Sequence, residues 1–155
     1  MRASAYALAL ALPLSLSLAL PVALTGCGPK TNLQRPDKEK ELLQDSVRLY
    51  WEAFRWGDEE KAGAFIEDAE DQVLYKDWLL VRKDRYKTEE ANVLQVSLGP
   101  EISEPEDGHL QTATVYVRTN GYTFPDQIVQ SDRVKQDWYR TVNGWFLSWD
   151  KEGAL

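Results

Sequence analysis

The stretch that decides the expected fold is Trp138-Tyr139-Arg140-Thr141-Val142-Asn143-Gly144-Trp145, near the end of the 155-residue chain. Asn-Gly strongly favours a two-residue β-hairpin loop, because both residues accept the positive φ angles of a type I′ turn. The run from about Gln127 to Val142 would form the strand before the turn, and Trp145 to Asp150 the strand after it. The stretch therefore predicts an antiparallel hairpin at the end of the domain.

A two-residue loop at Asn143-Gly144 also predicts which side chains share a face of the hairpin. In this register Val142 pairs with Trp145, Arg140 pairs with Leu147, and Trp138 pairs with Trp149. The face expected to be buried is mostly apolar and consists of Trp138, Arg140, Val142, Trp145, Leu147 and Trp149. The opposite face consists of Asp137, Tyr139, Thr141, Phe146, Ser148 and Asp150. We therefore expect an arginine in the middle of an apolar face.

Two further strands are expected before this hairpin. Val93 to Leu98 is rich in residues that favour strands, and Leu110 to Thr119 alternates between apolar and polar positions. The apolar positions of the second run are Ala113, Val115 and Val117. Pro105-Glu106-Asp107-Gly108 is typical of a turn, and Asn120-Gly121 indicates the next connection.

Helical spacing of apolar residues predicts three helices earlier in the chain. From Asp37 to Trp56 a stripe recurs every three or four residues, with Leu42, Leu49 and Ala53 widening the set of Leu43, Val47, Tyr50 and Phe54. Gly57 suits a helix end, and Asp58 suits the N-cap of a second helix with Ala62, Phe65 and Ile66 on one face. A third helix is expected from Asp71 toward Arg85, bringing together Leu74, Trp78, Leu79 and Val81.

Helices followed by a meander of strands predict an α+β domain, with the helices packed on one face of a curved antiparallel sheet. Three features resemble the NTF2-like superfamily, which includes SnoaL-like and ketosteroid-isomerase-like proteins. They are Tyr50-Trp51-Glu52-Ala53-Phe54 in the first helix, the Gly57-Asp58 break and the closing hairpin. The resemblance covers about residues 38–150. It implies a cone around a pocket, and many members are binding or accessory modules without catalysis.

Arg140, with Trp138 and Trp149, is the candidate ligand site inside such a cone. A guanidinium held among indole rings would clamp a carboxylate or phosphate while the rings stack on an apolar group. The alternative is that Arg140 lays its stem along the apolar face and pairs with a helix carboxylate. Tyr116 and Asp132 are further polar candidates for the inward face. No local motif matches a catalytic set, so no catalytic residue is assigned.

Metal and cofactor sites are not expected. His109 is the only histidine, and it follows a predicted turn where a solvated loop residue is the simplest interpretation. The acidic cluster Glu67, Asp68, Glu70 and Asp71 lacks the spacing of a calcium loop. These acids fit a helix junction in which they stabilise the N-terminus of the following helix.

The first 27 residues predict export and lipid attachment. A basic residue, Arg2, precedes an apolar run from about Ala5 to Leu20, as in a secretory signal. Pro13 and Pro21 interrupt the apolar stretch and disfavour the alternative, a membrane-spanning helix. Leu24-Thr25-Gly26-Cys27 resembles the lipobox of bacterial lipoproteins. The resemblance implies cleavage before Cys27, a diacylglyceryl group on its sulfur, and an acyl chain such as palmitate on its amine.

The expected division is a signal peptide (1–26), a polar tether with two prolines (27–36) and one domain (37–155). The chain has 18 Lys and Arg against 25 Asp and Glu, a formal net charge of −7. Such acidity argues against a nucleic-acid partner and against a polybasic grip on lipid. Membrane contact is therefore expected through the lipid at Cys27. In a Gram-negative cell, Gly28 after the lipidated cysteine would favour the periplasmic side of the outer membrane.

The sequence as a whole predicts a lipid-anchored lipoprotein of the cell envelope, with a non-catalytic module that binds a small ligand or an envelope protein. Two alternatives stay open. One is a small envelope enzyme of isomerase or hydrolase type, which would need an acid whose pKa is raised by burial in an NTF2-like pocket. The other is a structural subunit of an envelope assembly, which would expose an aromatic patch or a free sheet edge.

Overall fold

The computed structural model describes residues 35–105 and 107–151, and all of them belong to one compact unit, residues 32–155. The expected signal peptide, Cys27 and the tether up to residue 34 lie outside the described residues. Within the described part, no helix combines the length and the apolar character needed to cross a membrane.

Three helices begin the unit: α1 (Arg35–Trp56), α2 (Glu59–Gly63) and α3 (Ala69–Lys83). Gly57 follows α1 at φ +65°, and Asp58 caps α2 by accepting a 3.1 Å hydrogen bond from the Lys61 amide, as expected. Asp68 caps α3 in the same way through the amides of Glu70 and Asp71, each at 2.9 Å. The helix junction predicted from the acidic cluster is confirmed.

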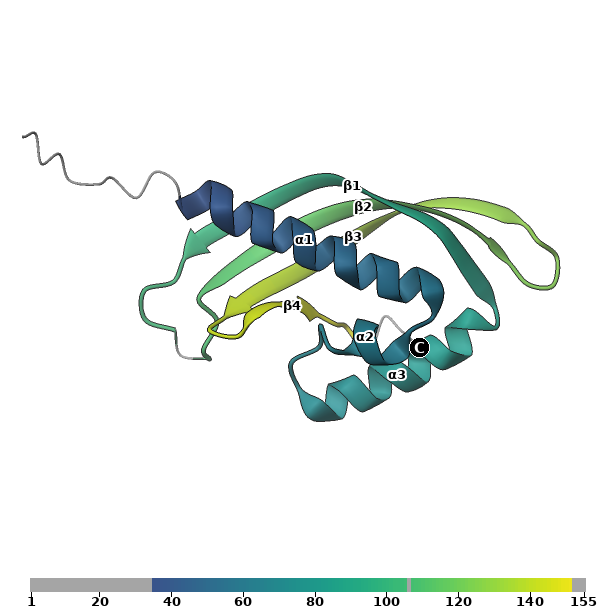
Figure 1. Ribbon diagram of the computed structural model, residues 1–155, viewed down its shortest axis with the longest axis horizontal. Helices are drawn as coiled ribbons and strands as arrows, with labels where there is room; N and C mark the ends of the chain where they lie inside the picture. Colours follow the sequence, from purple (N-terminus) through teal and green to yellow (C-terminus); the bar gives the residue numbers. More distant parts are fainter. Residues whose placement is uncertain (1–34, 106, 152–155) are drawn as a thin grey trace, which may run out of the picture. The chain divides into compact units, whose positions relative to one another are not determined.

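Four strands follow as an antiparallel meander in the order β1-β2-β3-β4 (Figure 1). They are β1 (Tyr86–Glu101), β2 (Gln111–Thr123), β3 (Val129–Thr141) and β4 (Gly144–Ser148). The α+β class is therefore confirmed. The strands β1 and β2 are longer than predicted, and Asn120-Gly121 lies inside β2 and not in a connection. A Cβ at Gly121 would lie 2.2 Å from the Lys87 carbonyl oxygen, so this glycine permits close backbone approach.

The predicted register of the last hairpin is wrong by two residues. Thr141 pairs with Gly144 and Trp138 pairs with Leu147, so the loop is Val142 and Asn143. A type I′ loop would need positive φ at both Asn143 and Gly144, and only the glycine has it, at φ 138°. A shift of two residues preserves the faces, so Trp138 and Leu147 are buried as expected. Val142, expected on the buried face, is 85% exposed at the tip.

The core lies between the helices and one face of the sheet, with α1 running across that face (Figure 1). The predicted stripe of Leu43, Val47, Tyr50 and Phe54 is buried, and so are Ala113, Val115 and Val117 of β2. Leu42 and Leu49 are exposed, and the prediction that they widen the stripe is wrong. Because α2 ends at Gly63, Phe65 and Ile66 follow it in a turn, from which the Phe65 carbonyl accepts a hydrogen bond from Leu147 of β4 at 2.8 Å.

Candidate functional site

The structure places the three residues expected to bind a ligand in different settings. Arg140 lies between two carboxylates, with 3.5 Å from Nη1 to Glu39 Oε1 and 3.5 Å from Nη2 to Glu101 Oε1. Glu39 belongs to α1, so this is the pairing with a helix carboxylate that the sequence left as the alternative. Trp138 is 1% exposed in the core. Trp149 is half-buried and lies beside α3, 5.5 Å from the ring of Tyr75.

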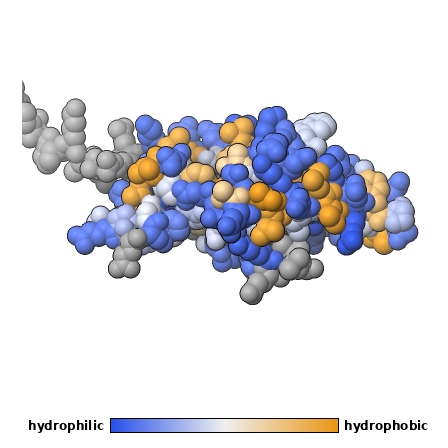
Figure 2. Space-filling model, turned by 90° about the horizontal axis from the view of Figure 1, so that it is seen from below, coloured by the Kyte–Doolittle hydropathy of each residue, from blue (hydrophilic) through white to orange (hydrophobic). Residues whose placement is uncertain are grey.

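A groove of about 530 Å³ runs beside α3, and we call it the α3 groove. Its walls come from α3, from the residues that lead into β1 and from the segment after β4: Leu74, Asp77, Trp78, Val81, Arg82, Arg85, Tyr86, Trp149 and Lys151. Leu74, Trp78, Val81 and Arg82 are spaced at three- and four-residue intervals and so lie on one helix face. Figure 2 shows the side of the domain on which α3 lies, where hydrophobic groups (orange) lie among hydrophilic ones (blue).

The floor of the α3 groove is aromatic and packs on the core. Trp78 lies 5.5 Å from Tyr75 and 6.3 Å from Trp149, measured between ring centroids. Tyr75 is fully buried and donates a 3.0 Å hydrogen bond to the Tyr50 hydroxyl of α1. The floor is therefore fixed to the core, while Leu74 and Val81 are exposed along its length.

Arg82 is the charged group at one end of this apolar floor. Its guanidinium carbon lies 4.8 Å from the ring centroid of Tyr86 and 5.5 Å from those of Phe54 and Trp78. Within residues 35–105 and 107–151, no carboxylate oxygen lies within 4.0 Å of this side chain. Its buried Nε has no acceptor among those residues either. The rings hold the cation, and no anion of the described chain neutralises it.

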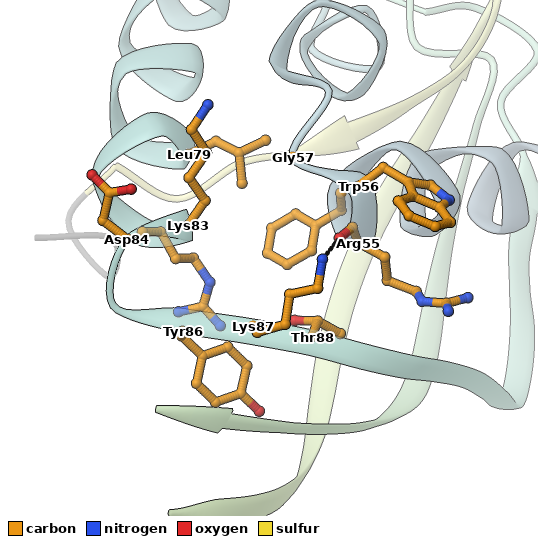
Figure 3. Close-up of a pocket in the computed structure, with 11 residues that line it drawn as sticks. Arg55, Trp56, Gly57, Leu79, Lys83, Asp84, Tyr86, Lys87 and Thr88 are labelled. Atoms are coloured by element: carbon orange, nitrogen blue, oxygen red, sulfur yellow. Dashed lines mark hydrogen bonds between the residues drawn. The ribbon is translucent and has the colours of Figure 1, made fainter. Parts of the chain in front are cut away.

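A second, smaller pocket of about 220 Å³ shares two lining residues, Arg82 and Tyr86, with the α3 groove. We call it the basic pocket, because Arg55, Lys83 and Lys87 line it together with Arg82. Figure 3 shows Lys87 reaching from β1 to the end of α1, where its Nζ donates a 3.2 Å hydrogen bond to the Arg55 carbonyl. The Asp84 carboxylate points away from Lys87 in the same view.

Tyr86 lines both cavities. Its hydroxyl is buried and has no hydrogen-bond partner in the part of the chain that the structure describes. Burial raises the pKa of Tyr86, the nearby Asp132 carboxylate raises it further, and the Arg82 cation opposes both effects. Tyr86 is therefore neutral at physiological pH and available only as a hydrogen-bonding group.

Asp58 and Asp137, which line neither of these two cavities, have lowered pKa values. The hydrogen bond from the Lys61 side chain lowers the pKa of Asp58. Burial would raise the pKa of Asp137, but hydrogen bonds from Lys135 and Thr114 outweigh it and the net shift is downward. Both acids are therefore ionised at neutral pH.

His109 does not line the α3 groove, and the acidic cluster reaches its rim through Asp71. His109 Nδ1 is 2.9 Å from Asp107 Oδ2, and its ring stacks on Tyr139 at 4.0 Å between centroids. Asp71 of the acidic cluster forms an ion pair with Lys151 at the groove rim. Among the described residues, no group of three His, Cys, Asp or Glu side chains is placed to hold a metal ion.

Sequence reasoning missed Arg82 and Tyr86. The available signal was the four-residue step from Trp78 to Arg82, which places an aromatic ring and a cation on one helix face. That step does not show that Arg82 lacks a carboxylate partner. Nor does it show the other two rings around the guanidinium, because Phe54 and Tyr86 come from other elements.

Comparisons with known proteins identify no family for this chain. No protein-family model matches it, and no curated protein matches it. Among solved structures, the chain is similar to the solution structure of a SEC-C motif containing protein from Rhodopseudomonas palustris. The identity is 18%, the match covers 64% of this chain and 69% of that chain, and the TM-score is 0.48.

Proposed function

We propose that the chain is a lipid-anchored lipoprotein of the bacterial cell envelope, whose NTF2-like domain is a non-catalytic binding module with the α3 groove as its ligand site. The order of elements, three helices and then an antiparallel meander, supports the NTF2-like assignment. The lipobox-like Leu24-Thr25-Gly26-Cys27 supports the anchor. In a Gram-negative cell the domain would face the periplasm from the outer membrane.

One observation carries the binding assignment: the α3 groove joins an apolar aromatic floor to a cation without a carboxylate partner. Ligand sites are typically concave and mostly apolar, with a few polar groups that orient the ligand, and their volumes are about 300–1,000 Å³. The α3 groove, at about 530 Å³, has this size and composition. Trp78 and Trp149 supply the apolar surface, and Arg82 supplies the orienting group.

The anchor would keep the domain near the bilayer. The seven residues from Gly28 to Gln34 connect Cys27 to the start of α1, and at about 3.3 Å per residue they reach on the order of 25 Å. The acidic chain is not expected to bind an anionic lipid surface by charge, so the acyl chains would supply the membrane affinity.

The anchor is tested by Cys27→Ser. The variant should stay unprocessed by the lipoprotein signal peptidase and incorporate no radiolabelled acyl chain when expressed in a bacterium. Wild-type chain, labelled in parallel, is the control. Normal acyl labelling of Cys27→Ser would contradict the proposed anchor.

The groove is tested with a neutral photoreactive n-alkanol and the full chain in phosphatidylcholine vesicles. We expect the probe to label the α3 segment, read by mass spectrometry of its peptides, and Val81→Glu to reduce that labelling at least about threefold by placing a charge on the apolar wall. Val73→Glu is the matched control, since Val73 is 58% exposed and Val81 is 55% exposed, both on α3, and only Val81 lines the groove. Labelling that ignores Val81→Glu, or that spares α3, would reject the groove as the binding site.

A further inference from the structure

We infer that the α3 groove takes a single-chain amphipathic carboxylate, an n-alkanoate, with its carboxylate on Arg82 and its hydrocarbon chain along Val81, Trp78 and Leu74. This inference rests on the proposed function of the groove as a binding site and names the chemical class of its ligand.

The charge around the groove is opposite in sign to that of the chain. The residues lining the α3 groove and the basic pocket include six Lys and Arg side chains but only Asp77 and Asp84 as acids, whereas the whole chain has a net charge of −7. Lys151 is engaged by Asp71, and Lys87 donates to a backbone carbonyl. Within residues 35–105 and 107–151, Arg82 and Arg85 line the groove without an ion pair to an acid, so an anion drawn to this region meets these two cations, and Arg82 is the one that the aromatic rings hold.

The guanidinium of Arg82 is prepared for a carboxylate. Three rings contact it at 4.8 to 5.5 Å, which fixes its position without using its N–H groups. A planar guanidinium donates two parallel hydrogen bonds to a carboxylate, and such charge-assisted bonds are stronger than neutral ones. The cost of ordering the side chain is already met by the packing of Phe54, Trp78 and Tyr86, so binding need not supply it.

The floor of the groove fits a hydrocarbon chain that leaves from Arg82. Val81, Trp78 and Leu74 precede Arg82 by one, four and eight positions on α3, so they continue from the guanidinium along the helix. Each methylene of the ligand that packs on one of these apolar side chains is removed from water, which stabilises the bound state. Trp149 adds a further apolar surface to the groove.

The test compares a photoreactive n-alkanoate with the n-alkanol of the same length, using the full chain in phosphatidylcholine vesicles at about pH 8, where carboxylic acids are ionised. The variant is Arg82→Met, which keeps an unbranched apolar stem. The readout is the labelling of the α3 peptides in the wild type divided by that in the variant, for each probe. Both proteins meet the same vesicles, so the partitioning of a probe into the lipid does not affect its ratio. We expect a ratio of about ten for the alkanoate, the effect of one charge-assisted contact, and about one for the alkanol.

Arg118→Met is the matched control, because Arg118 is an exposed arginine on β2 that lines neither cavity, and its ratio should be about one for both probes. Equal ratios for the two probes at Arg82→Met would overturn the carboxylate assignment, while continued labelling of α3 by the alkanol would leave the proposed binding function standing. Absence of α3 labelling by either probe would reject both.

A second measurement keeps the inference falsifiable where Arg82→Met fails to fold, as judged by far-UV circular dichroism. Labelling of the wild-type α3 segment by the alkanoate should fall several-fold between about pH 8 and about pH 4, relative to the alkanol, because the probe's carboxylate becomes protonated. An alkanoate-to-alkanol ratio that does not change with pH would overturn the role of the charge.

Discussion

Replacing Tyr75 with phenylalanine is expected to lower the free energy of unfolding by about 1–3 kcal/mol, although the substitution removes a single oxygen atom. The Tyr75 hydroxyl donates to the Tyr50 hydroxyl at 3.0 Å, and the two residues are 0% and 3% exposed. The ring shape is unchanged, so no cavity term is added. The cost arises because the Tyr50 oxygen is left buried without the donor it has in the folded protein.

The double variant Tyr50→Phe/Tyr75→Phe should cost no more than the larger single substitution. Removing both hydroxyls leaves no unsatisfied group, whereas each single change leaves one. A total stability of about 5–15 kcal/mol is typical of a domain, so all three variants should still fold. The pair is therefore suited to a double-mutant cycle.

The assay is thermal unfolding followed by far-UV circular dichroism, with urea unfolding to confirm that the m-value is unchanged. For a domain of this size, 1 kcal/mol corresponds to roughly 4 °C in Tm, so each single variant should melt about 4–12 °C below the wild type. If the two single effects add in the double variant, the hydroxyls do not interact in the folded chain, and the link between α1 and the floor of the groove is refuted.

Two further perturbations follow from the same core. Burial raises the pKa of Tyr50 to about 12 and raises that of Tyr75 further, while an unfolded tyrosine titrates near 10. The stability that these raised pKa values contribute is present below about pH 10 and is lost as the pH rises toward 12, by about 1.4 kcal/mol per pH unit for each tyrosine. A plot of the free energy of unfolding against pH should therefore fall less steeply over this range in the double phenylalanine variant than in the wild type. Gly121→Ala should cost about 1–3 kcal/mol in chemical unfolding, because its Cβ would lie 2.2 Å from the Lys87 carbonyl oxygen and 2.8 Å from the Tyr86 hydroxyl; a wild-type midpoint would show that β1 and β2 do not approach this closely.

Much of the fold could be predicted because burial leaves a period in the sequence. The three- and four-residue steps through Leu43, Val47, Tyr50 and Phe54 identify α1, and the alternation at Val115 and Val117 identifies the buried face of β2. The first part of β1, from Tyr86 to Asn92, shows no alternation between apolar and polar residues, although Thr88 is buried there, and so the sequence did not predict it. This part of β1 is held by backbone hydrogen bonds to β2, which a local sequence pattern does not reveal.

The site was harder to predict, because its defining property is a missing partner. Arg140 directly follows Tyr139 and Arg82 comes four residues after Trp78, yet Arg140 has Glu39 and Glu101 within 3.5 Å, while Arg82 has no such carboxylate among the described residues. Both acids come from elements distant in the chain. Composition and spacing therefore identify arginines on helix and strand faces, and only the tertiary arrangement distinguishes a neutralised one from a free one.

The short last strand also determines how the sheet meets other molecules. β4 pairs only with residues 137–141 of β3, so the edge of β3 from residue 129 to 136 has no strand beside it in the described part of the chain. An exposed edge of this kind is a template for aggregation unless charge guards it. Two such edges paired antiparallel about Val134 would set Arg133 of each copy against Lys135 of the other, which is repulsive. Charge repulsion at this edge thus opposes antiparallel pairing of two copies in that register.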